Sequence, residues 1–225
     1  VRPGSPMLRE ALDAYLAERD RQHEDETASL FAAYYARPSA DWLQNPLAAD
    51  GPDRFRVLAP YFRKYGARWR FEWRLLAAVA FQESRLDQTA VSRQGARGVM
   101  QLLPSTAREI GFVDISTAER NIAAGAAYLA QIRRNHFTDP AIARADQIYF
   151  TLAAYNAGPA RIDQLRRMAK VHGLDPHRWF GQVEQMALRV IGEETVRYVA
   201  NIHRYFIAYE LEAQFLERHR RGDPR

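Results

Sequence analysis

Apolar residues recur every three to four positions along most of this chain, the spacing that places side chains on one face of an α-helix. The pattern predicts one long or two short helices over residues 7–35, and a further helix from Phe55 to near Gly66. Pro104 opens a short helix that Gly111 ends. The other predicted helices cover residues 71–85, 117–137, 140–156, 158–171 and 193–216. No alternating strand pattern of convincing length occurs, so we expect an all-α fold.

Residues 36–53 interrupt the helical pattern. This segment holds three prolines and one glycine without periodicity, which is typical of a linker. The charge balance changes in the same region, because residues 1–50 carry 5 basic and 9 acidic groups, whereas the remaining 175 residues carry 27 basic and 18 acidic ones. We therefore expect a connector at residues 1–50, a main domain at 51–217 and a disordered basic tail at 218–225.

Composition limits the class of protein. With 225 residues, of which 47% are hydrophobic, the chain can bury a full core. It has no cysteine, which excludes disulfides, thiol nucleophiles and cysteine-based zinc sites. The longest apolar run covers only residues 75–81, so we expect no membrane span. The N-terminus lacks an apolar signal core, which fits a cytoplasmic protein or a trimmed fragment of a secreted one, and the start at Val1 favours the fragment.

The net charge of +5 suits a polyanionic partner such as nucleic acid, an acidic glycopolymer or anionic lipid, although solvated helix faces explain it equally well. No Lys/Arg run with interleaved aromatics occurs, so we expect no nucleic-acid partner. The six histidines form no pair at the ligand spacing i, i+4, and the chain has no phosphate-binding loop or dinucleotide fingerprint. We therefore expect neither a metal nor a cofactor.

The stretch FQESRLDQTAVSRQGARGVMQLLPSTA, residues 81–107, carries the strongest candidate for chemistry. Counting back from Glu83 by three, four and seven residues meets the apolar residues Ala80, Val79 and Leu76. The carboxylate therefore projects from the stripe that should face the core. Removing a carboxylate from water raises its pKa, which a general acid working near neutral pH requires. The alternative is an ordinary solvated glutamate that pairs with an arginine near the helix end.

Four ordered motifs carry a resemblance to a known family. They are Glu83-Ser84, then Ser92, Gly95, Gly98, Met100 and Gln101, then Ala154-Tyr155-Asn156-Ala157-Gly158, and last Glu194-Thr195 with Tyr198-Val199. In order and spacing they resemble the motifs of the soluble-lytic-transglycosylase (SLT) catalytic domain, over about residues 55–210. Residues 61–107 look especially like the membrane-bound lytic murein transglycosylase F subgroup.

The resemblance implies an all-α, lysozyme-like fold of the goose-type/SLT class, with a cleft. It implies cleavage of the β-1,4 bond between N-acetylmuramic acid and N-acetylglucosamine in peptidoglycan, with Glu83 as the catalytic residue. The substrate-binding residues that it implies are Ser92, Gly98, Met100, Gln101, Tyr155, Asn156 and Tyr198. The expected partner is a peptidoglycan glycan strand, and the expected state is a monomer.

Ordinary glycosidases use two carboxylates, whereas the matched motifs offer only Glu83. The other acids nearby in sequence are interpreted as capping or surface residues: Asp87, Glu109, Asp114 and Glu119. By resemblance, Glu83 protonates the glycosidic oxygen, the substrate N-acetyl group stabilises the sugar cation, and the muramoyl 6-hydroxyl attacks as Glu83 takes its proton. The product is a 1,6-anhydromuramoyl end, formed without net hydrolysis.

Each supporting residue also has a plainer structural interpretation. Gly95 and Gly98 let the backbone approach a sugar closely, or only form turns. Ser92 places a hydroxyl near the sugar, or caps its own turn. Gln101 can donate and accept hydrogen bonds to acetamido or hydroxyl groups. Met100 is expected to belong to the core first and to wall the cleft second.

The last two motifs supply candidates for the edge of the cleft. Tyr155 and Asn156 stand where a helix meets a Gly-Pro break. The resemblance implies that Tyr155 forms a hydrogen bond near Glu83, and the alternative is a buried structural tyrosine. Tyr198, in the last long helix, is placed to reach the same acid.

The resemblance also suggests a larger protein. Residues 1–50 look like the last helices of a solute-binding-like domain, or like a connector. We expect a periplasmic protein that remodels or recycles the cell wall, and an association with the outer membrane through a missing N-terminal part is open. Two other functions stay open: a muramidase that hydrolyses the same bond, and a catalytically silent helical module that binds peptidoglycan or assembles wall enzymes. The presence of Glu83 argues against the silent module.

Overall fold

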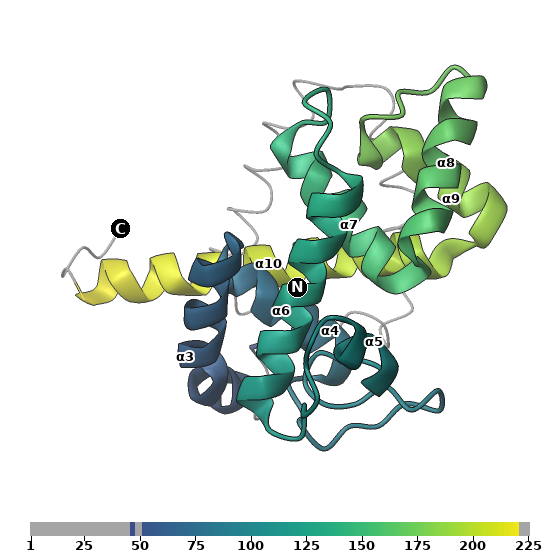
Figure 1. Ribbon diagram of the computed structural model, residues 1–225. Coiled ribbons are helices and arrows are strands. Elements are labelled where there is room, and N and C mark those ends of the chain that lie inside the picture. The colour runs from purple at the N-terminus through teal and green to yellow at the C-terminus, as the bar shows by residue number, and fades with distance from the viewer. Residues whose placement is uncertain (1–45, 48–50, 221–225) are drawn as a thin grey trace. The chain divides into compact units, whose positions relative to one another are not determined.

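The computed structural model of this protein describes residues 46–47 and 51–220, which Figure 1 shows in colour. The helices predicted over residues 7–35 and most of the predicted linker lie outside the described residues, as do residues 221–225 of the predicted tail.

The described part of the chain is helical, with two isolated β-bridges between residues 91 and 102. In order, the elements are α3 (Gly51–Trp69), α4 (Trp73–Ser84), α5 (Pro104–Glu109), α6 (Ala118–His136), α7 (Arg144–Ala157), α8 (Pro159–Val171), the short irregular helix η1 (Trp179–Val183), α9 (Glu184–Ile191) and α10 (Glu193–Arg220). The expected all-α fold is confirmed.

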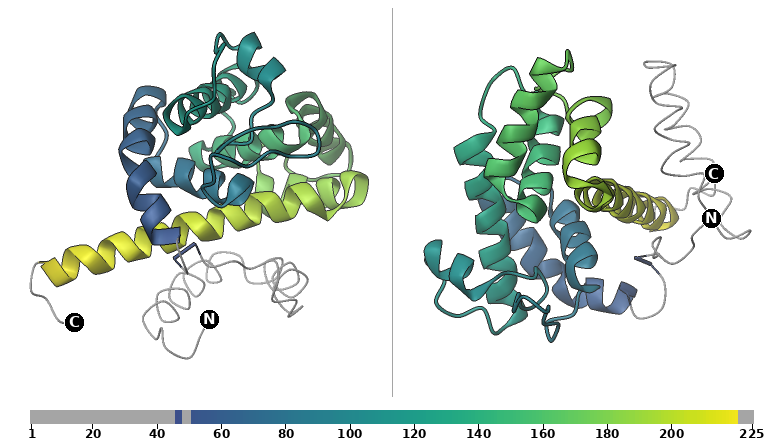
Figure 2. Two further views of the ribbon diagram at one scale, coloured as in Figure 1. Left: turned by 90° about the horizontal axis from the view of Figure 1, so that it is seen from below. Right: turned by 90° about the vertical axis from the view of Figure 1, so that its right-hand side faces the viewer.

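Helix α4 is enclosed by its neighbours. Every residue from 75 to 81 is buried, because α3 and α10 both pack against this helix. The long helix α10 runs along one side of the domain and also contacts α7 and α9 (Figures 1 and 2). The apolar run seen in the sequence is therefore a core helix, and α10 connects it to the helices that follow α6.

Aromatic side chains join the second half of the domain. Phe137 stacks on Phe150 with ring centroids 5.6 Å apart, and Phe150 meets Trp179 edge to face at 5.9 Å. These rings come from the end of α6, from α7 and from η1, and all three side chains are buried. Large aromatic rings in such contacts supply much of the apolar area that holds helices together.

Most helix boundaries agree with the sequence pattern. Helix α6 begins and ends within one residue of its prediction, and Thr117 caps it by accepting a hydrogen bond from the Arg120 N–H at 3.3 Å. Helix α7 begins at Arg144, four residues later than predicted. The delay has a local cause, because Asp139 holds a turn by accepting hydrogen bonds from the N–H groups of Ala141 and Ile142.

The segment between α8 and α10 differs from the prediction, which assigned no helix there. Its periodicity is broken by Phe180 and Gly181, whose backbone angles are not helical. Tertiary contacts hold η1 in place, since Trp179 is fully buried and its backbone N–H donates to the Asp146 carboxylate at 2.8 Å. At the other end, α10 continues to Arg220, past the predicted end at residue 216.

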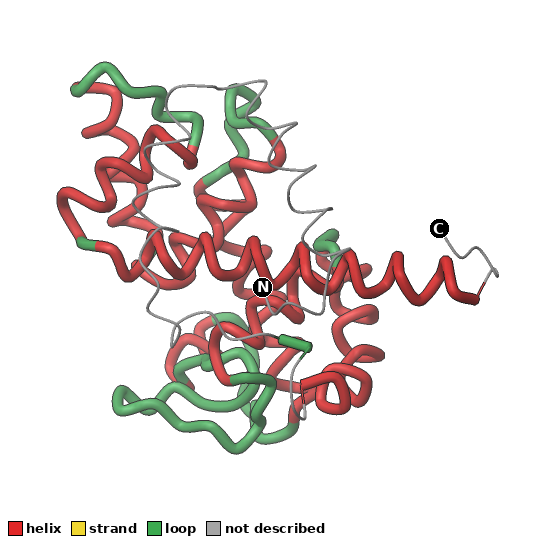
Figure 3. Tube along the Cα trace, turned by 180° about the vertical axis from the view of Figure 1, so that it is seen from behind, coloured by secondary structure: helices red, strands yellow, loops and turns green. Residues whose placement is uncertain are grey.

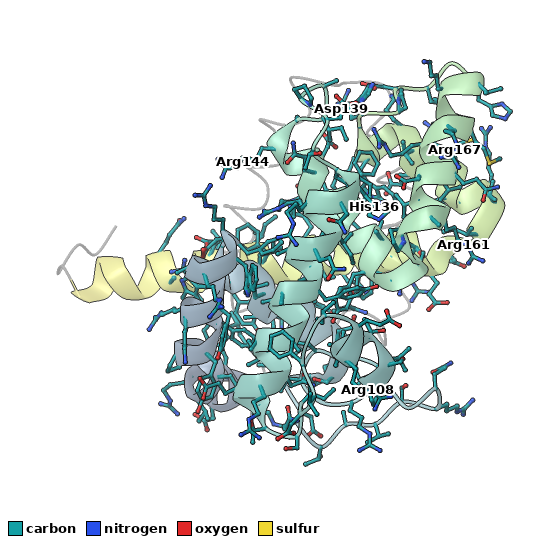
Figure 4. All side chains as sticks on the ribbon, in the orientation of Figure 1. Arg108, His136, Asp139, Arg144, Arg161 and Arg167 are labelled. Atoms are coloured by element: carbon teal, nitrogen blue, oxygen red, sulfur yellow. The ribbon has the colours of Figure 1, made fainter. Side chains whose placement is uncertain are left out.

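Basic side chains are spread over several elements. Figure 4 shows Arg108 on α5, Arg144 at the start of α7, and Arg161 and Arg167 on α8, at well-separated places in that view. Within the described residues, no helix is both long and apolar enough to span a bilayer.

Candidate functional site

Glu83 lies one residue before the end of α4. The helix ends at Ser84 because Arg85 adopts the left-handed conformation (φ 59°) and its N–H turns back to the carbonyl oxygens of Ala80 and Phe81. The buried run of α4 therefore stops at a carboxylate that is half-buried. This position shields Glu83 on the side of the core and leaves part of it accessible.

Burial raises the pKa of Glu83 from 4.5 to about 7. A carboxylate that loses part of its hydration is disfavoured in its charged form. The hydrogen bond from Tyr198 acts in the opposite direction and lowers the pKa, although it offsets burial only in part. Near neutral pH the two protonation states are therefore close in free energy, so this acid can both give up and regain a proton.

Tyr198 is the direct partner of Glu83. It lies on α10, and its hydroxyl donates to the Glu83 Oε1 at a distance of 2.5 Å. Burial, together with the charge of Glu83, raises the pKa of Tyr198 well above its ordinary value. Tyr198 is thus a neutral donor across the physiological range. Its contact with Glu83 agrees with the expectation that it can reach this acid.

Tyr155 was also expected near Glu83, but its hydroxyl has a different partner. Its hydroxyl donates to the Met100 carbonyl oxygen at 2.7 Å, so it does not bond the Glu83 carboxylate. Burial raises the pKa of Tyr155, and the charges of Glu83 and of Tyr128 raise it further. The resemblance implied a hydrogen bond from Tyr155 near Glu83, whereas the hydroxyl bonds to the backbone of the loop that follows α4.

That loop connects α4 to α5 through residues 85–103, drawn in green in Figure 3. It returns to the end of α4, where the Ser84 hydroxyl donates to the Val99 carbonyl oxygen at 2.8 Å. Antiparallel bridges pair Arg97 with Val91 and with Leu102, which fold the loop on itself. The backbone next to Glu83 is thereby tied down at several points.

Two side-chain amides form hydrogen bonds that hold the loop, one from α6 and one from the loop itself. Asn121 on α6 is fully buried, accepts from the Met100 N–H at 2.7 Å and donates to the Arg97 carbonyl oxygen at 2.9 Å. Gln88 donates to the Ser116 carbonyl oxygen at 3.0 Å and accepts from the Val99 N–H at 3.3 Å. Sequence reasoning missed both residues. The signal for Asn121 was a polar residue within the apolar face of α6.

Gly98 is buried within this network. Its φ is +77°, and a Cβ built there would lie 2.5 Å from the Asn121 Nδ2 and 2.9 Å from the Gln88 Nε2. The space that Gly98 leaves is therefore occupied by two amides of the protein itself. This contact supports its interpretation as a residue that the turn requires.

Gly98→Ala should lower the free energy of unfolding by about 3 kcal/mol, because it adds both backbone strain and overlap with Asn121. Gly95→Ala is the matched control, since Gly95 has a similar φ of +83° and no atom within 4 Å of its would-be Cβ. It should cost only about 1 kcal/mol, from the backbone alone. Urea unfolding of both variants measures the difference, and equal losses would contradict the proposed overlap.

The remaining predicted binding residues have distinct surroundings. Gln101 donates through Nε2 to the carbonyl oxygens of Ala90 at 3.1 Å and Gly98 at 2.9 Å, so its Oε1 is the atom left to face a ligand. Ser92 accepts from the Ala96 N–H at 3.1 Å and is therefore a local cap, as its plainer interpretation held. Met100 has no exposed surface, so its side chain belongs to the core, as its first interpretation held.

Asn156 is exposed at the end of α7, and its hydrogen bond leads to α10. Its Oδ1 accepts from the Thr195 hydroxyl on that helix at 2.7 Å.

Within the described residues, no group of three or more histidine, aspartate and glutamate side chains could hold a metal ion.

The helical fold of this domain has a counterpart among solved structures. The lytic transglycosylase Slt from Pseudomonas aeruginosa superposes on 69% of this chain and on 24% of its own, with a TM-score of 0.54 and 24% sequence identity. This similarity places the domain in the lysozyme-like helical class of folds, as the sequence predicted.

The chain belongs to the transglycosylase SLT domain family, whose model matches residues 60–173. Two similar proteins are named membrane-bound lytic murein transglycosylase F. The one from Pseudomonas fluorescens is 35% identical over 160 residues, covering 65% of this chain, and the one from Desulfosudis oleivorans is 37% identical over 166 residues, covering 68%. The match covers 32% and 36% of those proteins, so the chain spans about a third of their length. The family resemblance drawn from the four motifs is confirmed.

Proposed function

We propose that this domain is a lytic transglycosylase that cleaves the β-1,4 bond between N-acetylmuramic acid and N-acetylglucosamine in peptidoglycan and leaves 1,6-anhydromuramoyl ends. One observation carries the proposal: Glu83 is half-buried, has a pKa of about 7 and accepts a hydrogen bond from Tyr198. Membership in the SLT family and the names of the two relatives support it.

A single acid is consistent with this route. The pKa of Glu83 is set by burial and by Tyr198, without a contribution from another carboxylate among the described residues. Three of the four acids nearby in sequence bond to other groups: Asp87 to Thr89, Asp114 to Ser116, and Glu119 to Lys64. A hydrolase of the usual kind needs a second carboxyl group beside the first, and a transglycosylase does not, because its sugar supplies the nucleophile.

The proposed reaction moves one proton out and one back. Protonated Glu83 gives its proton to the glycosidic oxygen as the bond from that oxygen to the muramoyl C1 breaks. The N-acetyl carbonyl oxygen stabilises the positive charge at C1. The 6-hydroxyl oxygen then bonds to C1, and its proton passes to the Glu83 carboxylate, which restores the starting acid. Tyr198 keeps its own proton throughout and steadies the carboxylate while it is charged.

The other predicted residues fall into two groups. Gln101, with Oε1 as an acceptor, and Ser92, with a hydroxyl proton to donate, are proposed to meet acetamido or hydroxyl groups of the sugar. Asn156 is proposed to do so from the end of α7. Met100 and Gly98 are buried and are proposed to act only by shaping the loop.

Mass spectrometry of the products released from purified sacculi tests this proposal. We expect muropeptides with 1,6-anhydro ends, which are lighter by one water than hydrolysis products and do not react with borohydride because they lack a reducing end. Products that gain water and are reduced by borohydride would identify a muramidase. Binding to sacculi without any release would identify a silent module. Sacculi incubated without protein are the control.

The names of the two relatives describe membrane-bound proteins. On this basis we propose that the full-length protein works in the periplasm, in remodelling or recycling of the wall, with an outer-membrane association supplied by a part outside this chain. We expect the domain itself to be a monomer, which size-exclusion chromatography with light scattering would check.

A further inference from the structure

Thr195 makes the contact from which we draw a further inference. Its hydroxyl donates to the Asn156 Oδ1 at 2.7 Å and joins the first turn of α10 to the last turn of α7. The two residues are 39 positions apart in sequence. Thr195 is buried, with 4% of its surface exposed, whereas Asn156 is exposed. A buried hydroxyl thus holds a side chain that faces outward.

This bond has a specific effect on Asn156. The residue lies at a chain reversal, because α7 ends at Ala157 and α8 begins at Pro159. An exposed side chain at such a position would ordinarily sample several rotamers. The hydrogen bond from the Thr195 hydroxyl fixes the Asn156 amide with its Oδ1 toward α10. The two N–H donors of Nδ2 are then turned away from Thr195.

Helix α10 also supplies the hydrogen-bond partner of Glu83, which itself lies on α4. Tyr198 follows Thr195 by three residues, a spacing that places two side chains on one face of a helix. Tyr198 donates to Glu83 at 2.5 Å, while Thr195 donates to Asn156 at 2.7 Å. One rigid turn of α10 therefore sets the position of the carboxylate relative to the amide, although Glu83 and Asn156 belong to different helices.

We propose that Thr195 is a positioning residue, which holds the Asn156 amide so that its N–H groups donate to the acetamido or hydroxyl oxygens of the sugar bound at Glu83. This inference rests on the proposed function, because it assumes a glycan beside the acid. A contact made to a bound sugar both before and during reaction changes KM more than kcat. A purely structural role for Thr195 would instead reduce the amount of active protein and leave KM unchanged.

Thr195→Val removes the hydroxyl at nearly constant shape and is the test variant. We expect KM for peptidoglycan glycan strands to rise about tenfold, the size typical of one lost hydrogen bond, with little change in kcat. Thr195→Ser keeps the hydroxyl and should restore KM to within about twofold of the wild type. Should the valine variant fold poorly, Thr195→Ala gives the same comparison.

A double-mutant cycle with Asn156→Ala separates the two residues. Asn156 is exposed, so this variant should fold normally, and adding Thr195→Val to it should have no further effect on KM. The pH profile is a second readout. Thr195→Val should leave it in place, whereas Tyr198→Phe removes a bond that lowers the pKa of Glu83 and should move the alkaline limb to higher pH.

Three outcomes would overturn the inference. They are an unchanged KM in Thr195→Val, a rise in KM in Thr195→Ser as large as that in Thr195→Val, or additive effects on KM in the double-mutant cycle. Failure of the proposed function is a separate result, in which the wild type releases no products. In that case, sedimentation of the protein with sacculi replaces KM, and equal binding by the wild type and Thr195→Val would reject the positioning role by itself.

Discussion

Replacing Glu83 by glutamine should reduce the release of anhydromuropeptides from sacculi by at least about a thousandfold, since general acid–base catalysis contributes on that scale. Glutamine has almost the same shape as glutamate and can still accept the hydrogen bond from Tyr198. It has no acidic proton for the glycosidic oxygen, and no carboxylate to take the proton of the 6-hydroxyl. Both halves of the proposed reaction therefore fail together. Chromatography of the released muropeptides measures the loss.

Glu119→Gln is the matched control for this experiment. Glu119 lies on α6 and pairs with Lys64 at 2.7 Å on an exposed surface. Such pairs contribute little, so the variant should release products at the wild-type rate. Release that continued at the wild-type rate in Glu83→Gln would remove Glu83 from the mechanism, whatever the fold of the domain.

The same substitution should stabilise the folded domain at alkaline pH. The folded pKa of Glu83 is about 7, against 4.5 for the ordinary group. Below pH 4.5 the carboxyl group is protonated in both the folded and the unfolded chain. As the pH rises from 4.5 to about 7, the unfolded chain ionises first, so stability falls. Above this range both states are ionised, and the folded protein keeps the full cost of a buried charge.

The size of this cost follows from the difference between the folded and the unfolded pKa. A difference of one in pKa corresponds to about 1.4 kcal/mol, so the wild type should lose about 3 kcal/mol between pH 4.5 and 7 through this one group. Glu83→Gln carries no charge at any pH. It should therefore match the wild type near pH 4.5 and exceed it by about 3 kcal/mol above pH 7. Urea unfolding at several pH values measures both curves.

Glu119→Gln again provides the comparison, because the pKa of Glu119 is lowered in the folded protein whereas that of Glu83 is raised. The hydrogen bond from Lys64 lowers the pKa of Glu119, so its removal should give no gain in stability at alkaline pH. An equal gain in both variants would attribute the effect to net charge. No gain in Glu83→Gln would mean that the carboxylate is better hydrated than its half-buried position indicates.

These two effects of one substitution describe a single physical compromise. The acid has a pKa suited to catalysis because it has lost part of its hydration, and the same loss makes its charged form costly to the fold. The bond from Tyr198 reduces this cost, and it also keeps the pKa from rising further. The proposed catalytic role of Glu83 and the expected loss of stability at neutral pH thus both follow from the same burial.

Much of the candidate site was predictable from the sequence. The apolar stripe before Glu83 indicated a carboxylate at the edge of the core, and the structure places it at the end of the enclosed helix α4. The position of Tyr198 in the last long helix was consistent with a contact to this acid, which the structure shows directly. For Met100 the interpretation as a core residue was also correct, since its side chain is fully buried.

The parts that sequence did not predict are contacts between distant segments. Asn121 binds Met100 across 21 positions, and Tyr155 binds the same residue across 55. The sequence left open whether Gly98 allows close approach of a sugar or only forms a turn. The amides of Asn121 and Gln88, which lie where a Cβ would be, favour the second interpretation. No local pattern carries this information, because each bond depends on how several helices pack at once.

The sequence by itself determined the all-α class, most helix boundaries between residues 51 and 220, and the single acid in an apolar stripe. These properties follow from helical periodicity and capping, which act over a few residues. The tertiary structure alone decided that Tyr198 donates to Glu83 across 115 positions, and that Thr195 holds Asn156. Such bonds form only where packed helices bring their side chains within about 3 Å, a distance that no spacing along the chain specifies.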